Sequence, residues 1–125
     1  MEVEVENAIN ELKEIIEKCM NCGMCKSLCP VFAIVKEETL SPRGKIFVLK
    51  KDIYDKIMYD CSLCKLCEEK CPIKLEICNA FRKARLVLTE NKKETEANKK
   101  MISNIRKEGN PFGKEKGKIK ELFCC

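Results

Sequence analysis

Apolar residues recur at helical spacing along most of the chain. The first stripe, within residues 7–18, falls on one side of a helix and leaves most of the glutamates off it. It consists of Ala8, Ile9, Leu12, Ile15 and Ile16. Asn7 stands where a side chain can cap the start of a helix. This pattern predicts an amphipathic helix that leads into the first group of cysteines.

Two further stripes follow. Ser41 and Pro42 predict a helix start, because serine caps a helix and proline is favoured in its first turn. The stripe after this start comprises Ile46, Phe47, Leu49 and Ile53. A longer one comprises Ile73, Ile77, Ala80, Phe81, Ala84, Val87 and Leu88. Both predict helices with one buried face.

The last part of the chain is helical in propensity but poor in apolar residues. Residues 91–108 carry only scattered anchors, and the sequence Gly109-Asn110-Pro111 predicts where that helix stops. No segment alternates apolar and polar residues for long enough to predict a strand, since Val3 and Val5 make too short a run. We therefore expect an all-α fold.

Composition narrows the chemistry. The chain has 125 residues, 11 of them cysteine and none histidine, with a formal net charge of +5. Without histidine there is no catalytic triad, no His-ligated zinc and no His-ligated haem. No apolar stretch is long enough to span a membrane, and the acidic N-terminus lacks a signal-peptide layout. We expect a cytoplasmic protein, in which clustered thiols indicate metal binding or redox chemistry.

The cysteines form an internal repeat. The run Cys19-x2-Cys22-x2-Cys25-x3-Cys29-Pro30 recurs as Cys61-x2-Cys64-x2-Cys67-x3-Cys71-Pro72. This spacing is the bacterial ferredoxin pattern for [4Fe–4S] clusters, in which the fourth cysteine of each run binds the other cluster. The pattern predicts two [4Fe–4S] clusters. The first has the iron ligands Cys19, Cys22, Cys25 and Cys71, and the second has the iron ligands Cys61, Cys64, Cys67 and Cys29.

Zinc is the alternative metal for these thiols. Eight cysteines could hold two zinc ions, but zinc sites need neither the third cysteine at this spacing nor the Cys-Pro ending. A zinc-dependent scaffold or nucleic-acid module would use the basic C-terminal part of the chain. Eight thiolates around two clusters with a core charge of 2+ would cancel most of the formal +5, and we therefore expect no nucleic-acid partner.

Three cysteines lie outside the runs. Cys78 follows the second run within a predicted helix, where it is expected to be a small buried residue. Cys124 and Cys125 form a pair at the C-terminus, either as exposed thiols in a frayed tail or as groups that act at a partner's site.

The segment between the runs carries a family resemblance. A first run, then Ser41-Pro42-Arg43-Gly44 with Lys45 next, then a second run, resembles the N-terminal part of a family of iron–sulfur proteins. Its members are iron–sulfur subunits of the glycolate oxidase, anaerobic glycerol-3-phosphate dehydrogenase and heterodisulfide reductase type. The later sequence Asn110-Pro111-Phe112-Gly113 is similar to a connector that these proteins carry.

This resemblance implies an α-helical ferredoxin fold and a role in electron transfer. We expect a two-cluster domain over residues 1–90, with motifs at about 10–40 and 52–82, and a helical basic extension over 91–125. The implied partner is a redox protein, either a flavoprotein or a Cys-rich subunit with Cys-Cys-Gly motifs. In the family such a region follows this module, and here the sequence ends about where it would begin.

Two functions follow for the chain. The first is a non-catalytic electron-transfer subunit of an oxidoreductase, with no catalytic residue of its own. The alternative is a direct contribution to a heterodisulfide- or hydroxyacid-oxidoreductase active site, through Cys124 and Cys125.

Overall fold

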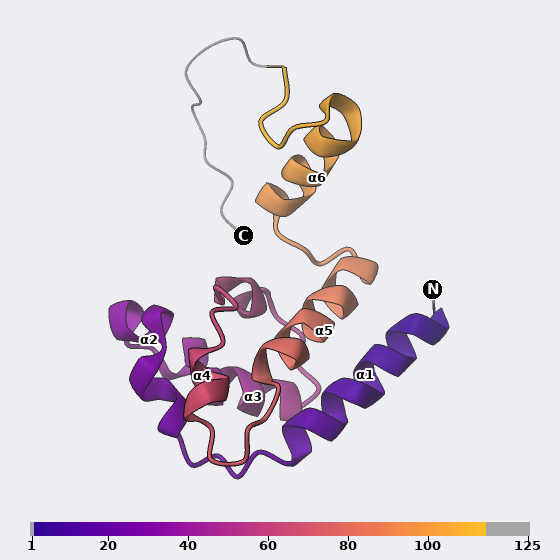
Figure 1. Ribbon diagram of the computed structural model, residues 1–125. Helices are drawn as coiled ribbons and strands as arrows, with labels where there is room; N and C mark the ends of the chain where they lie inside the picture. The colour runs from indigo at the N-terminus through magenta and orange to yellow at the C-terminus, as the bar shows by residue number, and fades with distance from the viewer. Residues whose placement is uncertain (1, 115–125) are drawn as a thin grey trace. The chain divides into compact units, whose positions relative to one another are not determined.

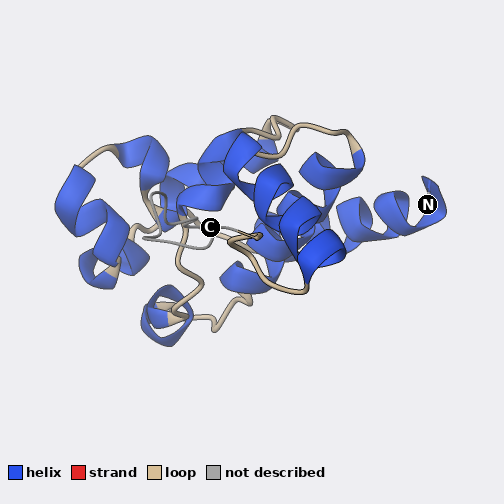
Figure 2. Cartoon of the chain, turned by 90° about the horizontal axis from the view of Figure 1, so that it is seen from above, coloured by secondary structure: helices blue, strands red, loops and turns tan. Residues whose placement is uncertain are grey.

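Helices account for all the regular secondary structure in residues 2–114, which are the residues that the computed structural model describes (Figure 2). The α-helices are α1 (Glu2–Glu17), α2 (Pro30–Val35), α3 (Pro42–Lys50), α4 (Leu66–Lys70), α5 (Ile77–Glu90) and α6 (Glu96–Glu108). The short 3-10 helices are η1 (Met24–Leu28), η2 (Glu38–Leu40) and η3 (Lys56–Asp60). The all-α prediction is therefore confirmed for this part of the chain.

The described residues divide into two compact units, with the boundary between Lys93 and Glu94. The core of the first unit lies between α1 and α5, which run side by side in Figure 1, and α3 also packs against α1. The side chains that close this core are Leu12, Ile16, Ile46, Leu49, Ile77, Ala80, Phe81, Ala84 and Leu88. All nine belong to the three apolar stripes, so those stripes mark the buried faces, except that Phe47 of the second stripe is exposed.

The helix boundaries differ from the sequence-based expectation at three places. Helix α1 begins at Glu2, so the prediction that Asn7 caps it was wrong. Glutamates in the first turn favour the extra turns, since they complement the positive end of the helix dipole. Ile53 and Ile73, which the stripes place in helices, lie outside α3 and α5 and are about half exposed, beside residues with left-handed backbone at Asp52 and Lys74.

The predicted start of α3 is confirmed. The Ser41 side chain accepts a hydrogen bond from the Gly44 N–H at 2.9 Å, and Pro42 occupies the first turn. Gly44 is required here, because a Cβ at this position would lie 1.8 Å from the carbonyl oxygen of Glu38. The start of α3 thus packs tightly on η2, and this contact orients the side chains at Arg43 and Lys45.

In the second unit, α6 ends where the sequence predicts, but it begins at Glu96 and leaves residues 91–95 of the predicted segment outside the helix. The Thr95 side chain caps its start, and Gly109 ends it in the left-handed conformation with φ 73°. None of its side chains is fully buried within the described residues. No helix in the described range is both long and apolar enough to cross a membrane.

Candidate iron–sulfur site

The two cysteine runs fold into loops with the same backbone path. The third and fifth residues of each run are left-handed: Asn21 (φ 56°) and Gly23 (φ 78°) in the first, Leu63 (φ 56°) and Lys65 (φ 64°) in the second. Each run then enters a short helix and ends on an extended cysteine. The internal sequence repeat is therefore also a structural repeat.

These left-handed residues are costly for a chain of L-amino acids. A non-glycine residue in this conformation costs roughly 1–2 kcal/mol, and Leu63 and Lys65 are ordinary side chains with no special tolerance for it. Strained backbone of this kind is typical of functional sites, where the surroundings hold it in place. The two bends curl each loop around its first three cysteines.

One pocket collects thiols from both runs. It is lined by Cys29 from the end of the first run and by Cys61, Cys64 and Cys67 from the second. Backbone N–H groups already point at two of these sulfurs, since Leu63 donates to Cys61 Sγ at 3.4 Å and Phe32 donates to Cys29 Sγ at 3.5 Å. The four residues assigned to the second cluster thus share one cavity wall.

The thiols assigned to the first cluster lie mainly on the first loop. Burial raises the pKa of the Cys25 thiol, an effect that a hydrogen bond from the Arg43 backbone opposes and that the neighbouring Cys19 and Cys22 reinforce. Cys71 is buried at the end of α4, which packs against η1, the helix that carries Cys25. The structure therefore brings three of these four residues together on one loop and places the fourth on a packed neighbouring element.

The two sets of thiols approach each other through Cys25 and Cys67. Burial raises the pKa of the Cys67 thiol, and the charges of Cys78, Cys61 and Cys25 add to that effect. Cys22 of the first set and Cys64 of the second are exposed, whereas Cys25 and Cys67 are buried. Each set thus has one cysteine at the surface and one facing the other set.

The donor set fits iron–sulfur chemistry. Soft thiolates are the ligands that such clusters take, and N–H groups directed at sulfur stabilise their negative charge. In residues 2–114 no three Cys, Asp or Glu side chains are close enough to share a single metal ion. A cubane is bound differently, because each of its four irons takes its own thiolate at a separate corner.

A basic side chain in the first turn of α3, Arg43, lies beside the first cysteine loop. The Arg43 side chain pairs with Glu38 at 2.8 Å, and Glu38 pairs also with Lys26 at 2.8 Å. Hydrogen bonds from Lys26 and Arg43 lower the pKa of the Glu38 carboxyl. A Cβ at Gly23 would lie 2.6 Å from Arg43 Nη1, so the first loop passes directly over this guanidinium.

Lys45 is the buried counterpart of Arg43. Its side chain is 1% exposed, lines the pocket of the second set and donates to the Leu40 carbonyl oxygen at 2.8 Å. Burial lowers the pKa of its ammonium, and the nearby Cys61 and Cys29 oppose that shift. Its Nζ also lies 6.0 Å from the centre of the Phe81 ring.

Cys78 is one of the pocket residues whose position the sequence did not predict. Its predicted burial is confirmed, at 1% exposure, but it also lines the pocket beside Cys67. No spacing rule includes a cysteine seven residues beyond the run, and only the return of α5 over the second loop brings it there. Cys124 and Cys125 lie outside the described residues.

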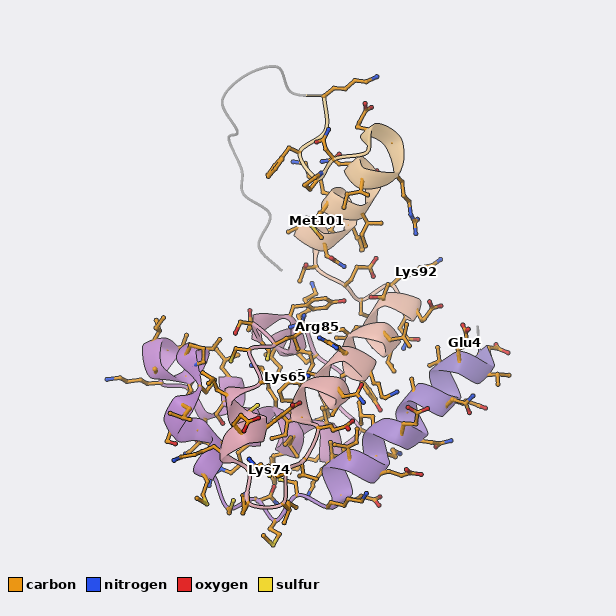
Figure 3. All side chains as sticks on the ribbon, viewed as in Figure 1. Glu4, Lys65, Lys74, Arg85, Lys92 and Met101 are labelled. Carbon is orange, nitrogen blue, oxygen red and sulfur yellow. The ribbon has the colours of Figure 1, made fainter. Side chains whose placement is uncertain are left out.

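Arg85 forms hydrogen bonds with the backbone where the second cysteine run begins. Its guanidinium donates to the carbonyl oxygens of Met58 (2.9 Å), Tyr59 (3.5 Å) and Cys61, and it projects from α5 in Figure 3. The planar guanidinium thus fixes two backbone carbonyl groups just before the second run and the carbonyl group of its first cysteine.

We expect Arg85→Lys to loosen this loop. A lysine keeps the charge but cannot reach three carbonyl groups at once, and hydrogen bonds to charged groups contribute about 1.5–3 kcal/mol. The variant should lose its metal absorbance at a lower temperature than the parent protein. Arg82→Lys, an exposed change on the same helix, is the matched control. Equal melting of the two variants would contradict the role of the Arg85 guanidinium.

The comparisons with known proteins agree with this geometry. Residues 15–75 match the family model described as a 4Fe-4S dicluster domain. An all-α fold that presents two matched cysteine loops, together with this match, defines the class as a helical iron–sulfur ferredoxin module. The match supports a 4Fe–4S ferredoxin module within residues 15–75, as the sequence resemblance predicted, and with it 4Fe–4S cluster binding.

Two of the curated relatives are named as iron–sulfur subunits. The chain is 31% identical over 109 residues to the probable glycolate oxidase iron-sulfur subunit of Bacillus subtilis, across 75% of this chain and 24% of that protein. It is 29% identical over 70 residues to the glycolate oxidase iron-sulfur subunit of Escherichia coli, across 50% of the chain and 17% of the relative. It is 27% identical over 92 residues to lactate utilization protein B of Oceanobacillus iheyensis, across 67% of the chain and 19% of the relative. The chain thus spans less than a quarter of the length of each of these relatives.

Proposed function

We propose that this chain is an electron-transfer subunit that passes single electrons through two [4Fe–4S] clusters. The first cluster would bind Cys19, Cys22, Cys25 and Cys71, and the second would bind Cys61, Cys64, Cys67 and Cys29. The observation that carries the proposal is the shared pocket, in which a cysteine from the first run joins three from the second. Residues 1–90 would form the two-cluster domain and residues 91–125 its extension.

The surroundings of the thiols support transfer of electrons rather than bond chemistry. Thiolate ligation, N–H groups directed at sulfur and nearby charges are the means by which a protein tunes a cluster. Cys22 and Cys64 would offer an exposed ligand at each cluster, and Cys25 and Cys67 are the buried thiols through which the two sets approach each other. An electron could therefore enter at one exposed cysteine and leave at the other.

The relatives suggest the kind of partner. Their names place them as iron–sulfur subunits of glycolate oxidase, or in lactate utilization. For this chain we propose a redox protein of a hydroxyacid oxidoreductase complex, a flavoprotein or a Cys-rich subunit, in the reducing cytoplasm.

The stoichiometry of the metal tests the proposal. Protein prepared without oxygen should contain about eight irons and about eight acid-labile sulfides per chain. Its brown absorbance should bleach on addition of dithionite, as the clusters take up electrons. A colourless protein with about two zinc ions and no sulfide would instead establish a zinc module.

A further inference from the structure

Lys45 is a buried charge that forms no ion pair, and Asp60 acts on it only from a distance. Within residues 2–114 no ion pair joins its ammonium to a carboxylate, and its one hydrogen bond goes to a neutral carbonyl group. A buried ammonium without a counter-charge costs several kcal/mol, and proteins rarely retain one without a use. Its place in the pocket wall puts it against Cys29, Cys61, Cys64 and Cys67. The thiols are therefore the groups that this charge faces.

The other charged side chains around the pocket are either hydrogen-bonded to backbone groups or exposed to solvent. Arg85 is spread over three carbonyl groups, and Glu68 accepts a hydrogen bond from the Cys78 backbone at 2.8 Å. Asp60 and Lys65 are exposed, so water and salt screen their fields. Lys45, at 1% exposure, acts through a medium of low dielectric constant, where the same charge has a larger effect.

The first set of thiols has a different electrostatic environment. Arg43, which lies against the first loop at Gly23, is one-third exposed at its side chain and is neutralised by Glu38 at 2.8 Å. One cluster would thus lie beside a paired and hydrated cation, and the other beside an unpaired and buried one.

We propose that Lys45 sets the reduction potential of the second cluster and raises it above that of the first. This inference rests on the proposed function. One-electron reduction adds a negative charge to the pocket and moves no proton, and the electron comes from the redox partner or, in a titration, from dithionite. Lys45 favours the reduced state because its attraction for the site grows with that added charge.

The charge can be removed with little change of shape. Lys45→Gln keeps a donor for the Leu40 carbonyl group but carries no charge, and Lys45→Arg keeps the charge. Lys51→Gln makes the same charge change at an exposed position just after α3 and is the matched control. The potentials of both clusters are measured by a redox titration followed by electron paramagnetic resonance. Cys64→Ser identifies the second cluster, since it displaces the couple of that cluster.

Lys45→Gln should lower the reduction equilibrium constant of the second cluster at least tenfold, which is about 59 mV for one electron. The first cluster should change less than threefold. Lys45→Arg and Lys51→Gln should leave both couples within twofold. Loss of four irons from Lys45→Gln, with all eight kept by Lys45→Arg, would also indicate that the second cluster requires a positive charge at position 45.

Three outcomes would overturn the inference. They are unchanged potentials in Lys45→Gln, an equal shift of both clusters, or an equal effect of Lys45→Arg. Each can occur in a protein that holds eight irons, so the inference can fail while the proposed function stands. A parent protein without iron would instead end the proposed function itself.

Discussion

Cys22→Ala is expected to leave about four irons per chain, while Cys78→Ala keeps about eight. Cys22 is proposed as a ligand of the first cluster, and a cubane without its fourth thiolate is readily lost. It is exposed, so its replacement creates no cavity and acts through the metal alone. Cys78 is buried in the pocket but is not assigned as a ligand, and its loss should cost only about 1 kcal/mol of packing.

Iron and sulfide are measured in the Cys22→Ala and Cys78→Ala proteins, which are prepared side by side without oxygen. The electron paramagnetic resonance spectrum of reduced Cys22→Ala should show one cluster, without the coupling between two. Eight irons in Cys22→Ala would remove Cys22 from the ligand set. Four irons in Cys78→Ala would mean that Cys78 is a ligand and that one member of the proposed second set is not.

Gly44→Ala is expected to lower the free energy of unfolding by about 3 kcal/mol or more. The sign is informative, since alanine in a helix interior normally stabilises by about 1 kcal/mol relative to glycine. Here the added Cβ would lie 1.8 Å from the Glu38 carbonyl oxygen and 3.0 Å from Thr39 Cα. Both are backbone atoms, so η2 must move away from α3.

The effect is measured by denaturant unfolding followed by circular dichroism. Gly109→Ala is the matched control, because a Cβ at Gly109 meets nothing within 4 Å and only the left-handed backbone, with φ 73°, opposes it. That control should cost about 1–2 kcal/mol and should leave the metal content unchanged. Stability of Gly44→Ala at or above that of the parent would contradict the tight contact.

Long helices were predictable because their burial is periodic. The stripe from Ile77 to Leu88 lies on the buried face of α5, and the Ser41 cap stands where its residue type predicts. The short helices α2, α4 and η1 were not predicted, since each spans six residues or fewer and shows no full period. The start of α1 was missed because dipole and propensity, rather than burial, extend it to Glu2.

Part of the candidate site could also be predicted from local sequence. The spacing of the cysteines is a local signal, and it predicted which thiols are the candidate ligands. Four of these thiols line one pocket in the structure. The positions of Lys45 and Cys78 depend on how α3 and α5 pack around the second loop, and no local pattern carries that information. Arg85 was missed likewise, because its partners lie more than twenty residues before it.

The left-handed bends at Leu63 and Lys65 bear on how the protein matures. A loop without metal has no thiolate–iron bonds to hold these two residues, and each would release roughly 1–2 kcal/mol on relaxing to ordinary backbone. The empty loop is therefore biased towards opening, which exposes its cysteines to a cluster donor. Once a cluster is transferred, its thiolate–iron bonds would hold the two bends in place, and these bonds would oppose its release to the donor.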